Sequence, residues 1–140
     1  MDGEIFLAGL IVPYPAGSSF DIVARRIQSG LGSRLGRTVV VENFGGASGS
    51  LGAQRLLKAD SETLTMLAAS PNELTLPPLA MTSVRYKPED FRMVALLTSG
   101  VLAVMARPNY PANSLRELAE KARQPGAQPL SFAALPAGRS

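Results

Sequence analysis

Residues 7 to 21 have the sequence LAGLIVPYPAGSSFD, and this stretch decides the fold. The apolar run Leu7–Tyr14 predicts a buried first β-strand, because short apolar runs bounded by turn residues are typical of strands in α/β proteins. Pro13, Pro15 and Gly17 then predict a tight turn. A strand that ends in such a turn and leads directly into a helix indicates an α/β fold.

A helix is predicted to follow this turn. Its apolar residues recur at every fourth position and form one stripe, made of Val23, Ile27, Leu31 and Leu35. Ser18, with Asp21 three residues later, predicts an N-terminal cap, and Gly36 predicts a C-terminal cap. Two glycines inside the helix, Gly30 and Gly32, weaken it by about 1 kcal/mol each relative to alanine.

The rest of the chain continues to alternate strands and helices, which favours a mostly parallel sheet. Further strands are predicted at Thr38–Glu42, Thr63–Ala69, Met93–Thr98, Leu102–Ala106 and Leu130–Ala133. Further helices are predicted at Ala53–Ala59 and at Ser114–Arg123, the second with a capping box. The segment Pro71–Pro88 predicts a loop, because the pair Pro77-Pro78 opposes regular structure.

The composition limits the chemistry that the chain can perform. Its 140 residues are enough for one ordinary domain, and they include no histidine and no cysteine. The usual nitrogen and sulfur ligands of zinc, the base of a Ser-His-Asp triad and a thiol nucleophile are therefore missing. An enzyme that uses Asp21 with Glu42 or Glu73 stays open, although no spacing pairs these carboxylates. The net charge of +3 comes with scattered arginines and no interleaved aromatic residues, which does not indicate nucleic-acid binding.

The turn from Pro15 to Asp21 is the first candidate ligand site. Gly17 allows a ligand to approach the backbone closely, and the start of the next helix offers N–H groups and the positive end of a dipole. Ser18 and Ser19 add hydroxyl donors. Such a turn can hold an anion without a charged side chain. The alternative interpretation is a well-capped turn that binds nothing.

Three further loops follow predicted strands. The glycine-rich segment Glu42–Ala53 lacks the spacing of dinucleotide and phosphate-binding loops. Ser70–Glu73 follows the third strand, and Ala137–Ser140 follows the last one. Ligands of open α/β sheets bind outside the carboxyl ends of strands, so these loops could converge on one crevice. Taken singly, each is typical of an ordinary surface turn.

The strings Ile11–Gly17 and Asp21–Arg25 are similar to the opening signature of the Bug-type receptors, the substrate-binding proteins of tripartite tricarboxylate transporters. Further matches keep the family's order: Leu35-Gly36, Val39–Asn43, Gly49–Ala53, Thr65 with Leu67, Tyr86–Phe91 and Ser114–Leu118. The resemblance extends over residues 10 to 140 and depends on the shared order and spacing of many short motifs.

The resemblance implies a two-lobed, Venus-flytrap α/β fold of the type II periplasmic binding class, with residues 1–106 in the first lobe and residues 107–140 starting the second. It implies a periplasmic receptor, not an enzyme, which captures a small carboxylate or dicarboxylate without a cofactor or metal and delivers it to membrane permease subunits. The ligand-binding residues that it implies are Pro15, Ala16, Gly17, Ser18, Ser19, Asp21, Ser70, Asn72, Gly138 and Ser140. Asp21 is expected to cap the helix and anchor water, because its charge would repel a carboxylate.

The chain also departs from the family. Gly17-Ser18 replaces the usual Gly-Gly, and Phe44-Gly45 replaces the usual Arg-Pro. Family members are longer, so we expect a truncated, N-terminal part of a receptor, with a non-binding remnant as the alternative. The apolar run Ile5–Val12 follows acidic residues and predicts neither a membrane span nor a signal peptide.

Self-association is a further expectation. An incomplete second lobe would leave apolar side chains without their covering elements, and exposed apolar patches favour association. The side chains concerned are Leu115, Leu118, Leu130 and Phe132.

Overall fold

The computed structural model describes residues 7–101 and 103–131. These residues form two compact units, residues 7–98 and residues 99–131. The expected lobe boundary between residues 106 and 107 stays a prediction. Gly138 and Ser140, two of the expected ligand-binding residues, lie outside the described residues, and so does Phe132.

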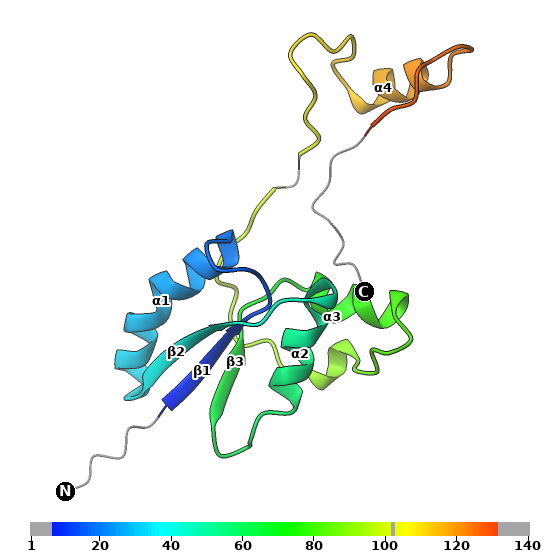
Figure 1. Cartoon of the computed structure of the whole chain (residues 1–140). Coiled ribbons are helices and arrows are strands. Elements are labelled where there is room, and N and C mark those ends of the chain that lie inside the picture. Colours follow the sequence, from blue (N-terminus) through cyan, green and yellow to red (C-terminus); the bar gives the residue numbers. More distant parts are fainter. Residues whose placement is uncertain (1–6, 102, 132–140) are drawn as a thin grey trace, which may run out of the picture. The chain divides into compact units, whose positions relative to one another are not determined.

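The first unit is built on a three-stranded parallel sheet (Figure 1). Its strands are β1 (Leu7–Val12), β2 (Thr38–Asn43) and β3 (Leu64–Leu67), in the spatial order β2-β1-β3. Helix α1 (Ser19–Leu35) connects β1 to β2, and helix α2 (Ser50–Leu57) lies between β2 and β3 in the chain. The predicted α/β fold with a parallel sheet is therefore confirmed.

One face of the sheet forms the main core with α1. Side chains alternate across a strand, so Ala8, Leu10 and Val12 of β1 point to the same face, and each is at most 3% exposed. They pack with Ala24 of α1 and Val39 of β2. Because β1 also buries Ile11 on the opposite face, its sequence is apolar almost throughout.

The opposite face of the sheet is only partly covered by the described residues. Ile11 is buried there, whereas Leu7 and Val40 are 50% and 41% exposed. These residues, together with Leu51 and Arg55 of α2, line an open groove with a volume of about 630 Å³. None of the expected ligand-binding residues that the structure describes lines this groove.

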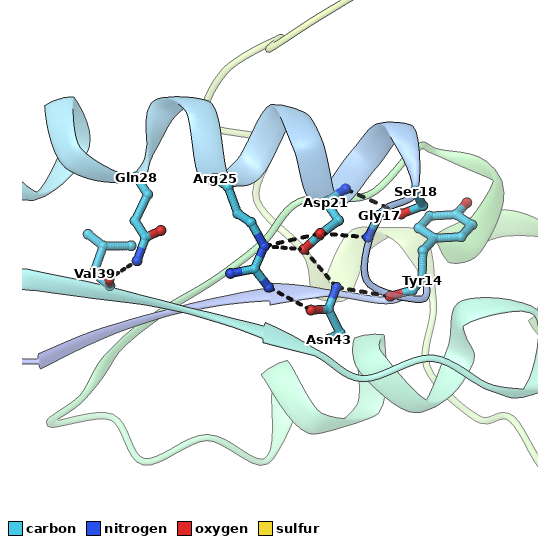
Figure 2. A network of polar contacts seen from close by, with 8 residues as sticks. All are labelled: Tyr14, Gly17, Ser18, Asp21, Arg25, Gln28, Val39 and Asn43. Carbon is cyan, nitrogen blue, oxygen red and sulfur yellow. Dashed lines mark hydrogen bonds and ion pairs between the residues drawn. The ribbon is translucent and has the colours of Figure 1, made fainter.

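Both predicted caps of α1 are confirmed. The Ser18 hydroxyl accepts a hydrogen bond from the backbone N–H of Asp21 at 3.3 Å. Gly36 ends the helix in the left-handed conformation, with φ 61°. Along the helix, Gln28 donates from Nε2 to the carbonyl of Val39 at 2.7 Å, which joins α1 to β2 (Figure 2).

The prediction of a loop throughout Pro71–Pro88 is wrong, because helix α3 occupies Asn72–Ala80 and includes Pro77 and Pro78. Proline at position 77 cannot donate to the carbonyl four residues earlier, that of Glu73. The Tyr86 hydroxyl donates to this carbonyl instead, at 2.5 Å. The acceptor left open by a proline is thus satisfied by a side chain from a later segment. A short 3-10 turn, η2 (Pro88–Asp90), follows.

The two strands predicted at Met93–Thr98 and Leu102–Ala106 are wrong for the described residues, which form no strand there. The side chains of Met93 and Met105 are 77% and 88% exposed. An apolar run becomes a strand only when a neighbouring strand pairs with it, and none of β1, β2 and β3 does so. Of the strand predicted at Leu130–Ala133, residues 130 and 131 are not in a strand, and the rest lies outside the described residues.

The second unit contains helix α4 (Leu115–Ala122), as predicted. Its N-cap is Ser114, whose hydroxyl accepts from the Glu117 N–H at 3.2 Å. The Glu117 carboxylate accepts from the Asn113 N–H, one residue before the cap, at 2.7 Å. Within the described residues, no helix has the length and apolar character needed to cross a membrane.

Gly30 and Gly32 provide a matched test of how α1 packs. A Cβ at Gly30 would meet nothing within 4 Å, so Gly30→Ala is expected to raise the free energy of unfolding by about 0.5–1 kcal/mol. A Cβ at Gly32 would lie 2.8 Å from the carbonyl oxygen of Arg37, which is too close. Gly32→Ala is therefore expected to lower the free energy of unfolding. Urea unfolding of both variants measures the two changes. An equal gain at both positions would contradict this packing.

Candidate functional site

The candidate site is built on the turn that leaves β1 and enters α1. Its tight geometry comes from Gly17, which has φ +83°, and from a hydrogen bond from the Ser18 N–H to the Pro15 carbonyl at 3.2 Å. A residue with a side chain adopts such a positive φ only with strain. Pro15, Ala16 and Gly17 are exposed, so this turn presents its backbone to solvent.

The turn is held by the carboxylate of Asp21, which is 3% exposed (Figure 2). Asp21 accepts hydrogen bonds from the Gly17 N–H at 2.8 Å, from Arg25 Nε at 3.0 Å and from Asn43 Nδ2 at 2.9 Å. The bond from Gly17 contributes most to lowering the pKa of Asp21 to about 2 from its usual 3.8, followed by those from Arg25 and Asn43. The carboxylate therefore stays charged and is fully occupied within the protein.

Asn43 extends this network from α1 to the end of β2. Its side-chain amide also donates to the Tyr14 carbonyl at 3.1 Å, and its oxygen accepts from Arg25 at 2.9 Å. Arg25 and Asn43 were not among the expected site residues. The spacing of Asp21 and Arg25, four residues apart on one helix, could have indicated their ion pair. Nothing local in the sequence indicated the contact with Asn43, which is 22 residues from Asp21.

Several donors at the start of α1 remain available to a ligand. Among the hydrogen bonds of the described residues, none uses the backbone N–H of Ser19 or Phe20. The first N–H groups of a helix lack intrahelical acceptors, so these two can serve an external one. The N–H of Gly17 is different, since it already donates to Asp21.

The loop after β3 is held by a second buried carboxylate, that of Glu73, which is 6% exposed. Glu73 accepts from the backbone N–H and the hydroxyl of Ser70, at 2.7 and 2.8 Å. Its other oxygen accepts a hydrogen bond from the Tyr14 hydroxyl. Burial, together with this bond, raises the pKa of Tyr14 well above its usual range. The Ser70 oxygen accepts from the Asn72 N–H at 3.3 Å, while the Asn72 side chain is exposed.

The carboxylates considered for acid–base chemistry all have partners within the chain. Asp21 and Glu73 are held as described, and Glu42 forms an ion pair with Arg55 at 2.8 Å. Within residues 7–101 and 103–131, no group of three or more acidic side chains could hold a metal ion.

Comparison with known sequences identifies the family. The family model described as the tripartite tricarboxylate transporter family receptor matches residues 23–140. The chain is 33% identical over 111 residues to protein BugT of Bordetella pertussis, covering 78% of this chain and 34% of that protein. It is 36% identical over 110 residues to a UPF0065 protein of Agrobacterium vitis, covering 78% and 32%. The chain thus spans about a third of the length of these relatives.

Solved structures agree on the fold. MatC from Rhodopseudomonas palustris, solved with bound malate, has a TM-score of 0.63 and 30% identity, covering 83% of this chain and 40% of that chain. A periplasmic transporter has a TM-score of 0.52 and 32% identity, covering 59% and 28%. Together with the parallel α/β sheet, these likenesses define the class as the periplasmic binding proteins. Within that class, this chain belongs to the tripartite tricarboxylate transporter receptor family.

The network around Asp21 predicts a distinct pH dependence of stability. Its pKa is lower in the folded chain than in the unfolded one, so its contribution is present above about pH 4 and is lost as the pH falls through about 2. Asp21→Asn is expected to lower the urea midpoint near neutral pH, and the difference from the parent should shrink between about pH 4 and 2. Asp60→Asn, at an exposed carboxylate outside the network, is the control. A pH-independent difference would contradict the prediction.

Proposed function

We propose that this chain acts in an extracytoplasmic solute receptor, which captures a small carboxylate or dicarboxylate for a tripartite tricarboxylate transporter. The observation that carries the proposal is the start of α1, where the N–H groups of Ser19 and Phe20 have no acceptor among the described residues. They stand at the positive end of a 17-residue helix. A ligand carboxylate placed there gains charge-assisted hydrogen bonds and a favourable dipole.

The negative charge of Asp21 does not oppose this binding, because it is compensated before a ligand arrives. Arg25 forms an ion pair with Asp21 at 3.0 Å, and the same carboxylate takes up the N–H of Gly17. We therefore assign Asp21 to shaping the turn rather than to contacting the ligand. Pro15, Ala16 and Gly17 form the exposed wall of the site.

The hydroxyls of Ser18 and Ser19 supply further donors. Ser18 accepts from Asp21 through its oxygen, so its own hydrogen remains available to a ligand. Two or three hydrogen bonds to a charged group, each contributing about 1.5–3 kcal/mol, suit micromolar capture after the cost of immobilising the ligand.

The other expected residues divide between shaping and contact. In the proposal, Ser70 shapes the loop after β3, since its hydroxyl hydrogen is used by Glu73. Asn72 offers an exposed amide to the distal end of the ligand. Gly138 and Ser140, which lie outside the described residues, belong to the proposed site through the family resemblance alone.

The family supports the proposed ligand class and the proposed partners. MatC was solved with malate, and a dicarboxylate of this kind matches the donors at the α1 start. A receptor of this family works in the periplasm and hands its ligand to membrane permease subunits. We extend this location and these partners to the present chain as part of the proposal.

The turn is tested by one substitution and its matched control. Gly17→Val should abolish the binding of malate, because its branched side chain would block the backbone approach and strain a residue at φ +83°. Gly36→Val introduces similar strain at φ +61° at the other end of α1 and should leave affinity nearly unchanged. Isothermal titration of the parent and both variants with malate and with a panel of dicarboxylates measures these affinities. If Gly17→Val binds as well as the parent, the turn does not hold the ligand.

A further inference from the structure

We propose that Glu73 is a positioning residue, which fixes the turn after β1 and the loop after β3 relative to each other so that both can act on one ligand. The proposal rests on the function proposed above and adds a residue that no resemblance implies. Glu73 lies in the first turn of α3, and only 6% of its surface is exposed. It is therefore placed to act through its neighbours rather than by contact with a ligand.

The side chain of Glu73 joins two segments that are far apart in the sequence. One carboxylate oxygen accepts from the hydroxyl of Tyr14, the residue just before the Pro15–Asp21 turn. The other accepts from both the N–H and the hydroxyl of Ser70, at 2.7 and 2.8 Å. The bond to Tyr14 spans 59 positions, so no local structure provides it. These three donors are neutral, and each depends on the same carboxylate for its acceptor.

Two further contacts hold Glu73 itself in place. The Tyr86 hydroxyl donates to its backbone carbonyl at 2.5 Å. Gly49, in the segment after β2, lies against its side chain so closely that a Cβ there would be 2.3 Å from Glu73 Cγ. Segments that follow all three strands therefore meet at this one residue, at the sheet end where ligands of α/β proteins bind.

A carboxylate accepts from all three of these donors at once, with one oxygen directed to each segment. An amide of the same size has one accepting oxygen, and its nitrogen would face either Tyr14 or Ser70 with a donor. In Glu73→Gln the amide oxygen can serve only one of the two segments, and the other keeps at best a weaker bond in which the Tyr14 hydroxyl accepts from the amide, with little change in volume. Tyr14→Phe removes a single bond, and it keeps the charge of Glu73 and the stacking of ring 14 on Phe20, whose centroids are 4.3 Å apart.

The experiment compares the parent chain with Glu73→Gln, Tyr14→Phe and the control Glu62→Gln, at an exposed carboxylate outside the cluster. Isothermal titration with malate is expected to show an affinity loss of about tenfold or more for Glu73→Gln and a smaller loss for Tyr14→Phe. The control should bind as the parent does.

Two measurements made without ligand accompany the titration. Amide hydrogen exchange at Ser70 should accelerate in both site variants. The Tyr14 phenol should titrate at lower pH in Glu73→Gln.

The outcomes separate this inference from the function on which it rests. If the parent binds no dicarboxylate, the proposed function fails, and the exchange and phenol readouts still decide whether Glu73 couples the segments. If those readouts change while the variants bind malate like the parent, the positioning assignment is overturned. Unchanged exchange at Ser70 in Tyr14→Phe overturns the coupling itself. If Glu73→Gln does not fold, Tyr14→Phe alone decides both points.

Discussion

The hydrogen bonds of the Asp21 carboxylate are the constraint on which the first unit depends. They hold the Gly17 N–H, the Arg25 guanidinium and the Asn43 amide at once, so that a turn, a helix and a strand end meet at one buried charge. A buried charge is costly unless it is paired and hydrogen-bonded, and here both conditions are met within the chain. The turn is thereby shaped in advance, and a ligand would not have to organise it.

The same arrangement explains how an acidic residue can lie beside a site for anions. Arg25 cancels the charge of Asp21 at short range, while the helix start directs its remaining N–H groups outward. Among the described residues, the Glu73 carboxylate has no cationic partner of this kind, because it is buried and accepts hydrogen bonds from neutral donors. Each carboxylate holds several segments together at the sheet end and leaves the exposed donors to other residues.

The features predicted correctly from the sequence are those with local causes. The caps at Ser18 and Gly36, the apolar strand before the turn and the helix after Ser114 each depend on neighbours within a few positions. The features that were missed depend on distant partners. Helix α3 tolerates Pro77 because Tyr86 supplies a donor to the Glu73 carbonyl, 13 positions away. The bond from Asn43 to Asp21 spans 22 positions, and that from Tyr14 to Glu73 spans 59. The strands predicted at Met93–Thr98 and Leu102–Ala106 are wrong for the described residues, because strand pairing is not local either.

The bond from Gln28 to Val39 has a consequence for the outer edge of β2. Phe44 donates its N–H to the Val12 carbonyl, so residues at every second position before Phe44 direct their N–H and C=O groups towards β1. Val39 lies at one of the positions between them, so its carbonyl points away from β1. An outward carbonyl on an edge strand is a template for a foreign strand to extend the sheet. In this chain the amide of Gln28 already occupies that acceptor at 2.7 Å, so one residue of the valine-rich edge is closed to cross-β growth.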